Sequence, residues 1–299
     1  MDKYKAWVGW YNAIQLIPVL ILDAAQMNVD LHCHTNISDG ALPPETLIRL
    51  AEERNVDMLS ITDHDSIQAY NNLRPPCANL QLIPGIELSS YWNKYGVHIV
   101  GLNLDLSSAA IQEGVAQQSQ AREERAIKIA DKLQRLGFDN CLAGAKSFTS
   151  GGQVGRPHFA QHLVAIGAVS SIQQAFNKYL GAGKVGDIKE QWADMAQTID
   201  WIRGAGGVAV LAHPTKYKMT RSKINLLLED FVALGGEAME VISGLQIPSV
   251  TKDMAKLCNS HGLMASSGSD FHSDQQPWAA LGMVAPLPDS CTPVWQSWR

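Results

Sequence analysis

Residues 28–40, NVDLHCHTNISDG, begin with a short apolar strand, Val29 to Leu31, and continue into two histidines spaced two apart. Pro43 and Pro44 then open a helix that we expect to run through Arg54, because apolar residues recur there at helical spacing. This strand–loop–helix unit decides the fold because the rest of the chain repeats it.

Six further apolar strands follow at Met58–Thr62, from Leu82–Pro84 onward, and at Val97–Leu102, Gly207–Ala212, Ala238–Ile242 and Leu263–Ser267, with helices expected at 222–234 and 249–261. Alternating strands and helices favour parallel strands with right-handed crossovers, and hence a barrel or a doubly wound sheet. The rhythm is interrupted between 105 and 205 by a long polar helix at 110–136, a glycine-rich stretch and further helical sequence. We therefore predict an N-terminal extension outside the fold (1–27), a first barrel part (28–104), an inserted helical subdomain (105–205) and a second barrel part (206–299).

Composition narrows the functional class. The chain has 299 residues, is 46% hydrophobic and carries a net charge of −5, which argues against a broad basic surface and a stable nucleic-acid complex. Five scattered cysteines, none in a C-x-x-C pair, favour a reducing cytoplasm. The apolar run from Ala13 to Leu22 is too short to cross a membrane, so we expect no membrane association and interpret Met27 as the natural start.

Imidazoles and carboxylates gather where the expected strands end, although the sixth strand, ending at Ser243, offers no obvious ligand. In a closed barrel the carboxyl ends of the strands meet on one face, where active sites of such folds lie. Six of the nine histidines occupy such positions, whereas His162 and His261 lie within helices and are interpreted as structural. The predicted metal ligands are His32, His34, Asp39, His64, Glu87, His98, His213, Asp270 and His272.

Nine donors exceed the four to six ligands, roughly, that one ion needs, so two or three divalent ions are expected. Imidazole and carboxylate without thiolate favour Mn²⁺, Fe²⁺ or Zn²⁺ over Mg²⁺ or Ca²⁺. Ions about 3.5–4 Å apart can share a hydroxide and clamp the oxygens of a phosphoryl group. This chemistry predicts a metal-dependent phosphoesterase in which Asp270, His64 and His213 are essential for catalysis.

Substrate contacts are less clearly marked. Arg156 and His158 lie in a Gly-Arg-Pro-His segment whose helix start suits an anion, and a structural role is equally possible. Lys184 in a glycine-rich loop, and Tyr217 and Arg221 after the fifth strand, are further candidates, with a solvated loop or a helix start as the alternatives. Two arginines of the long polar helix, 122 and 125, are interpreted as a solvated face.

From about residue 28 to 288 the motifs resemble the PHP (polymerase and histidinol phosphatase domain) family, within it the YciV/TrpH branch. The matching segments are His32-x-His34 with Ser38-Asp39-Gly40, Thr62-Asp63-His64-Asp65, Gly85-Ile86-Glu87, Gly155-Arg156-Pro157-His158-Phe159, Ala205 to Pro214 and Ser266 to His272. The resemblance implies a distorted seven-stranded (β/α) barrel with an inserted helical subdomain and a trinuclear, often manganese, centre. It implies one ion on His32, His34, Glu87 and Asp270, a second on Glu87, His98 and His213, and a third on Asp39, His64 and His272.

The branch is similar to enzymes that remove the 5′-phosphate of nucleoside 3′,5′-bisphosphates and to 5′→3′ exoribonucleases that trim short RNA. We therefore expect attack on phosphorus by a metal-bridged hydroxide, with a nucleotide or short RNA as substrate. Two alternatives remain open: another small-molecule phosphatase, such as one for histidinol phosphate, and a non-catalytic PHP interaction module. The identity of the metal, the group that protonates the leaving oxygen, the preferred RNA length and the oligomeric state are not encoded in any motif.

Overall fold

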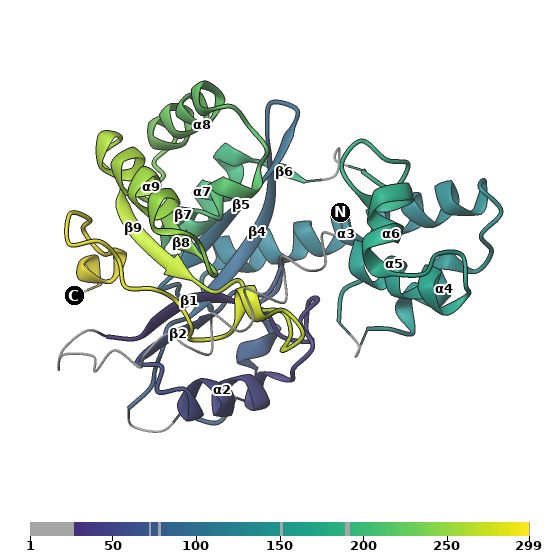
Figure 1. The fold of residues 1–299 in the computed structure, drawn as a ribbon, viewed down its shortest axis with the longest axis horizontal. Helices are drawn as coiled ribbons and strands as arrows, with labels where there is room; N and C mark the ends of the chain where they lie inside the picture. Colours follow the sequence, from purple (N-terminus) through teal and green to yellow (C-terminus); the bar gives the residue numbers. More distant parts are fainter. Residues whose placement is uncertain (1–26, 72, 77–78, 150–151, 189–191, 299) are drawn as a thin grey trace, which may run out of the picture.

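The computed structural model describes residues 27–71, 73–76, 79–149, 152–188 and 192–298 (Figure 1). The predicted N-terminal extension therefore lies outside the described residues, except for Met27. The strands are β1 (Val29–Cys33), β2 (Met58–Ile61), β3 (Gln81–Leu82), β4 (Gly85–Trp92), β5 (Tyr95–Leu102), β6 (Ala193–Asp194), β7 (Val208–Leu211), β8 (Ala238–Ser243) and β9 (Met264–Gly268).

The helices are α2 (Pro44–Glu53), η1 (Gln68–Tyr70), α3 (Ala109–Gln134), α4 (Cys141–Lys146), α5 (Arg156–Ala165), α6 (Ile172–Ala175), η2 (Phe176–Leu180), α7 (Met195–Gly204), η3 (Pro214–Lys216), α8 (Arg221–Ala233), α9 (Pro248–Ser260), η4 (Pro277–Ala279) and η5 (Val294–Ser297). None of the helices in the described part of the chain combines the length and apolarity needed to span a bilayer.

The strands form a distorted α/β barrel, as predicted. Two sheets, β1-β2-β3 and β6-β4-β5-β7-β8-β9, are joined at both edges by backbone hydrogen bonds. On one side the Asp270 N–H donates to the carbonyl of His32 at 2.8 Å, and on the other the Asp65 N–H donates to the carbonyl of Glu87 at 2.9 Å. The ring runs β1-β2-β4-β5-β7-β8-β9, and the two-residue strands β3 and β6 extend its edges.

The expectation of parallel strands is wrong for β5, which runs antiparallel to both β4 and β7. Asn93 and Lys94 alone separate β4 from β5, and this turn leaves no room for a crossover helix. Asn93 adopts a left-handed φ of 53°, which its short amide side chain tolerates. Glu87 and His98 consequently lie within their strands, as diagonal neighbours on one face of the hairpin, rather than at consecutive strand ends.

The barrel interior is apolar at the end opposite the histidines. Val208 and Val210 of β7 point into this interior cluster, whereas Ala209 and Leu211 point outward into the core under α7, α8 and α9. This alternation follows from the two-residue period of a strand. The apolar cluster packs the strands together at one end of the barrel, and polar side chains occupy the other end.

The helices from α3 to η2 lie beside the barrel and carry a hydrophobic cluster of their own, on the right in Figure 1. Phe159, Ala160, Leu163 and Leu180 are its fully buried members from α5 and η2. Two later elements of the interval 105–205 pack with the barrel instead, because β6 pairs with β4 and Ile199 of α7 lies in the same hydrophobic cluster as β4, β5 and β7.

The expectation of a solvated arginine face on α3 is wrong. Arg122 and Arg125 are 8% and 7% exposed, and their guanidinium groups lie 5.2 and 4.9 Å from the ring centroid of Trp192. Nε of Arg122 donates to Oδ2 of Asp65 at 2.7 Å. Asp65 is fully buried and follows His64 in the chain. The charged side of α3 therefore binds the helical part to the barrel.

Candidate metal centre

His32 and His34 leave β1 on the same side, and their Nε2 atoms lie 3.1 Å apart. Cys33 points away, into the cluster of buried side chains under α2. Both histidines are fully buried. At this distance either one nitrogen is protonated and donates a hydrogen bond to the other, or both nitrogens face a shared cation.

Glu87 is the centre of the arrangement and is fully buried. Its Oε1 lies 2.8 Å from Nδ1 of His98 and 2.9 Å from Nε2 of His213. Its Oε2 lies 3.3 Å from Nε2 of both His32 and His34, and 2.8 Å from Nδ1 of His64. One carboxylate thus meets five imidazoles contributed by four different segments of the ring.

Asp39 forms a second focus. Its carboxylate lies 3.3 Å from Nε2 of His272 and 3.8 Å from Nε2 of His64. The loop that carries it is held by Asp63, which accepts hydrogen bonds from the Thr35 N–H and from the hydroxyls of Thr35 and Ser38 at 2.5–2.7 Å. A Cβ at Gly40 would lie 2.4 Å from the carbonyl oxygen of His34, so this return of the loop requires glycine.

Two further candidate ligands occupy left-handed backbone conformations, with φ of 30° at His213 and 55° at Asp270. Such conformations cost free energy for a residue with a side chain and persist where the surroundings over-determine them. Here they turn both side chains inward directly after β7 and β9. The strain is concentrated where the ligands must converge.

Glu240 on β8 contacts the cluster, although the sequence interpretation assigned no residue of the sixth strand to it. It is 2% exposed, and its Oε1 lies 2.5 Å from Nδ1 of His32. Its Oε2 accepts the His213 N–H at 2.6 Å. The available signal was a carboxylate inside an apolar strand, because a buried carboxylate requires partners.

Lys216 in η3 was also missed. Its Nζ forms an ion pair with Oδ2 of Asp270, and its side chain is 49% exposed. Burial lowers the pKa of this amine, but the charge of Asp270 outweighs it and the pKa is raised. Lys216 is therefore a cation beside the ligands.

The donor set fits divalent metal ions. All nine predicted ligands fall into groups whose donor atoms lie within 4.8 Å of one another: His34, Asp39, His64 and His272; His32, His34 and Asp270; His32, Glu87 and His213; and His64, Glu87 and His98. Glu87 Oε2 and His64 Nδ1 are buried and make no hydrogen bond within the described residues, although they lie 2.8 Å apart. Buried polar atoms without partners call for a ligand, and a divalent cation is one that this donor set could hold.

Protons balance the charge of this cluster when no cation does. Burial raises the pKa of Glu87, but the neighbouring His64, His98 and His32 outweigh it and hold that pKa well below its usual value. Burial lowers the pKa of His34, whereas its hydrogen bonds to Asp270 and Glu87 raise it to about 10. Metal ions and protons therefore compete for the same nitrogens.

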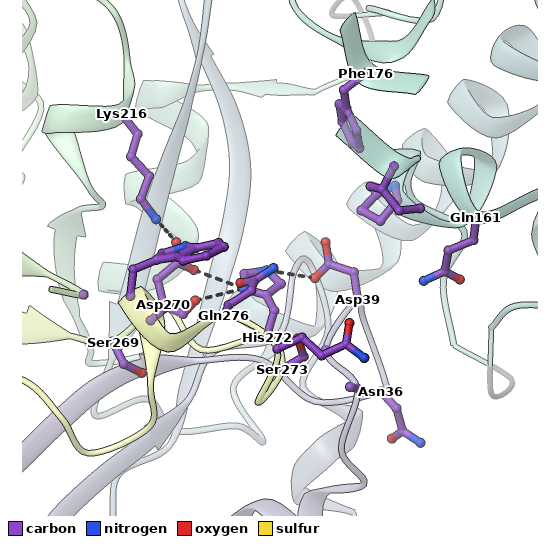
Figure 2. A pocket seen from close by; sticks show the side chains of 18 of the residues that line it. Asn36, Asp39, Gln161, Phe176, Lys216, Ser269, Asp270, His272, Ser273 and Gln276 are labelled. Carbon is purple, nitrogen blue, oxygen red and sulfur yellow. Dashed lines mark hydrogen bonds and ion pairs between the residues drawn. The ribbon is translucent and has the colours of Figure 1, made fainter. Parts of the chain in front are cut away.

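A cavity of about 810 Å³ opens onto the cluster (Figure 2). Asp39, Asp270, His272 and Lys216 line its floor, while Gln161 and Phe176 project toward it from the helical part. The metal-ligand candidates thus reach a space of the size that small-molecule ligands occupy.

Of the five predicted substrate contacts, only His158 lines this cavity. Arg156 donates to the carbonyl of Leu180 at 3.2 Å and to Asp187 at 3.4 Å, away from the cavity. The other three residues do not line the cavity either. Lys184 lies in the loop after η2, and the hydroxyl of Tyr217 accepts the His98 N–H at 2.9 Å. Arg221 pairs with Asp253 on the surface of α8 and α9.

Comparison with known proteins gives a consistent set of relatives. The model of the family described as "PHP domain" matches residues 30–207. The 5′-3′ exoribonuclease Rnm of Escherichia coli (strain K12) is 42% identical over 274 residues, which are 90% of this chain and 93% of the relative. The 3′,5′-nucleoside bisphosphate phosphatase of Chromobacterium violaceum is 39% identical over 272 residues, 90% of this chain and 95% of the relative. A crystallised amidohydrolase from Chromobacterium violaceum, with bound sulfate and no metal, superposes with a TM-score of 0.83 at 39% identity, covering 90% of this chain and 95% of that one.

Proposed function

The chain belongs to the PHP domain family, and from this premise we propose that it is a metal-dependent phosphoesterase acting on nucleotides. The reaction is hydrolysis of the 5′-phosphate of nucleoside 3′,5′-bisphosphates and 5′→3′ trimming of short RNA. The support is the pair of relatives described as an exoribonuclease and a bisphosphate phosphatase, each matched over 90% of this chain.

The observation that carries the proposal is the position of Glu87, whose two oxygens face five imidazoles. This buried carboxylate belongs to the cluster whose members Asp39, Asp270 and His272 line the cavity. Bound divalent ions supply an activated water nucleophile and neutralise the charge that develops on the phosphoryl oxygens. We assign Mn²⁺ to the site, because the donors are nitrogen and oxygen without thiolate; Fe²⁺, Zn²⁺ and Mg²⁺ are the ions to compare with it.

In this proposal three ions bind, and Asp270, His213 and His64 are indispensable because each belongs to the ligand set of a different ion. The sets are His32, His34, Glu87 and Asp270 for one ion, Glu87, His98 and His213 for the second, and Asp39, His64 and His272 for the third.

The remaining polar groups orient these ligands and the substrate. Glu240 accepts from Nδ1 of His32 and so directs its Nε2 toward Glu87. Lys216 provides a point charge for a substrate phosphate oxygen at the cavity floor, the role that the sequence suggested for Arg156. His158 accepts the Gly155 N–H on Nδ1 at 2.9 Å, which leaves Nε2 as its protonated nitrogen.

We also propose that the enzyme acts in the cytoplasm. The four cysteines in the described residues are free and buried, which suits a reducing compartment: Cys33, Cys141, Cys258 and Cys291.

The test is phosphate release by chelator-stripped protein reloaded with each of the four ions. The substrates are adenosine 3′,5′-bisphosphate, AMP, histidinol phosphate and a 5′-phosphorylated oligoribonucleotide. We expect the bisphosphate and the oligoribonucleotide to be consumed, fastest with Mn²⁺, and AMP and histidinol phosphate to react much more slowly. Preference for histidinol phosphate, or no turnover with any ion, would refute the proposal.

The site assignment needs its own control. Asp270→Asn should reduce turnover by at least about 100-fold with an unchanged far-ultraviolet circular dichroism spectrum, because a neutral amide oxygen binds a divalent cation more weakly than a carboxylate does. Asp274→Asn removes a carboxylate of the same loop that is 61% exposed, and it should retain wild-type turnover. Equal activity of the two variants would exclude Asp270 as a ligand.

A further inference from the structure

One part of the cavity carries side chains that the proposed reaction does not use. Trp278, Phe148 and Ile172 line it and are 50%, 41% and 41% exposed. Phe176 lines it as well and reaches in from the helical part, across from Asp39 in Figure 2. Large apolar side chains gathered beside a reaction centre mark a binding surface.

The same lining offers few cations. Lys216 is the one Lys or Arg residue in the described lining, and its Nζ already pairs with Asp270. A second phosphate therefore has no unpaired Lys or Arg to bind within this lining. An uncharged flat group is the ligand that such a wall accepts.

Trp278 is held in place by its backbone, while its indole remains half exposed. Its carbonyl accepts the Leu245 N–H at 2.7 Å, which links η4 to the loop after β8. At Gly244, with φ of 62°, an added Cβ would lie 2.7 Å from the same carbonyl oxygen, so glycine is required for this approach. A fixed backbone presents the ring at little further cost in conformational entropy.

We propose that the nucleobase of the substrate binds in this cavity, stacked on Trp278, and that Phe148 and Phe176, which line the same cavity from the helical part, add apolar contacts to it. This inference rests on the proposed function and adds the element that recognises the base. Every base offers a π-face, so stacking tolerates any sequence, as an enzyme that removes successive nucleotides requires. The helical part thereby contributes to substrate binding without supplying a metal ligand.

The test compares 2′-deoxyadenosine 3′,5′-bisphosphate with its abasic tetrahydrofuran analogue, which has both phosphates and no base. Trp278→Ala should lower kcat/KM for the nucleotide by roughly 5- to 150-fold, mainly through KM, the usual range for loss of one base–aromatic stack. The abasic substrate should react equally with wild type and variant. Trp278→Phe, which retains a smaller ring, should lie between the two on the nucleotide.

Leu226→Ala is the matched control, because Leu226 is 54% exposed on α8 and does not line the cavity. It should leave both substrates unaffected. The inference would be overturned if Trp278→Ala and Trp278→Phe lost activity equally on both substrates, or lost none on either. In that case, turnover of the substrates by the wild-type protein would still support the proposed function. Wild-type protein that hydrolyses neither bisphosphate would overturn both.

Discussion

Replacement of Glu240 by glutamine tests whether a carboxylate that is not itself a metal ligand sets the geometry of the centre. Two donors converge on this side chain, Nδ1 of His32 at 2.5 Å and the His213 N–H at 2.6 Å. A glutamine side chain keeps the shape but offers one oxygen, so one of the two donors must then face an amide NH₂ group.

The magnitude follows from the kind of bond that is lost. A hydrogen bond to a charged group contributes about 1.5–3 kcal/mol, against about 0.5–1.5 kcal/mol for a neutral pair. Loss of one such charge-assisted bond alone costs about 2 kcal/mol, which corresponds to roughly 30-fold in affinity. This value lies within the 10- to 100-fold loss that is typical when the partner of a ligating histidine is removed.

The assay is equilibrium dialysis of Glu240→Gln against buffered Mn²⁺, with the bound metal counted, followed by kcat/KM for phosphate release. We expect a loss of roughly 30-fold in Mn²⁺ affinity, with activity recovered in part at saturating metal. Glu237→Gln, an exposed substitution just before β8, should match the wild type. Wild-type metal affinity in Glu240→Gln would refute the assigned role of this carboxylate.

Three further predictions concern the cluster and its anchor. His64→Asn should lower turnover by at least about 100-fold while the thermal unfolding of the metal-free protein changes little, and retention of activity in the pure variant would contradict the ligand assignment. Because the metal-free protein keeps His34 protonated up to a pKa of about 10, Mn²⁺ binding at pH 8 should release protons and tighten as the pH rises. Calorimetric heats that do not depend on the ionisation enthalpy of the buffer would argue against this. Arg122→Met should destabilise the fold by about 3–5 kcal/mol in urea unfolding at pH 7, because it leaves the buried Asp65 without its cation. Burial raises the pKa of Asp65, but the charge of Arg122 outweighs this effect and the pKa is lowered, so the ion pair stabilises the fold at pH values above the pKa of Asp65 in the unfolded chain. The difference in unfolding free energy between wild type and variant should therefore shrink as the pH falls. A difference that stays constant with pH would contradict the pairing.

The positions of the strands and of the candidate ligands were accessible from sequence because both depend on local patterns. Apolar runs ending in histidine or carboxylate located His32, His34 and His213 at the ends of β1 and β7, where the structure has them. The sequence prediction gave β5 the wrong direction, because it assumed a helix between successive strands, whereas a two-residue turn at Asn93 joins β4 to β5. Asparagine between aromatic-rich strands is a hairpin signal that was present in the chain.

Burial of charge was the main feature that local patterns did not reveal. A polar helix such as α3 is usually solvated. Here Arg122 pairs with Asp65, and both Arg122 and Arg125 lie against the ring of Trp192. These partners are 57 or more positions away in the chain. Glu240 was hidden for the same reason. Their partners are brought close only when the ring closes.

The segments that close the ring are the same segments that carry the candidate metal ligands. The bonds that close it are backbone bonds of the ligand segments, Asp270 N–H to the His32 carbonyl and Asp65 N–H to the Glu87 carbonyl. A ligand side chain can therefore be replaced without opening the barrel, since the closing bonds do not involve it. The reverse does not hold: a Cβ at Gly268 would lie 2.3 Å from Cβ of His32, so even alanine there would force β9 from β1 and separate ligands that are themselves unchanged. The geometry of this centre depends on small residues at the seam as much as on the donors.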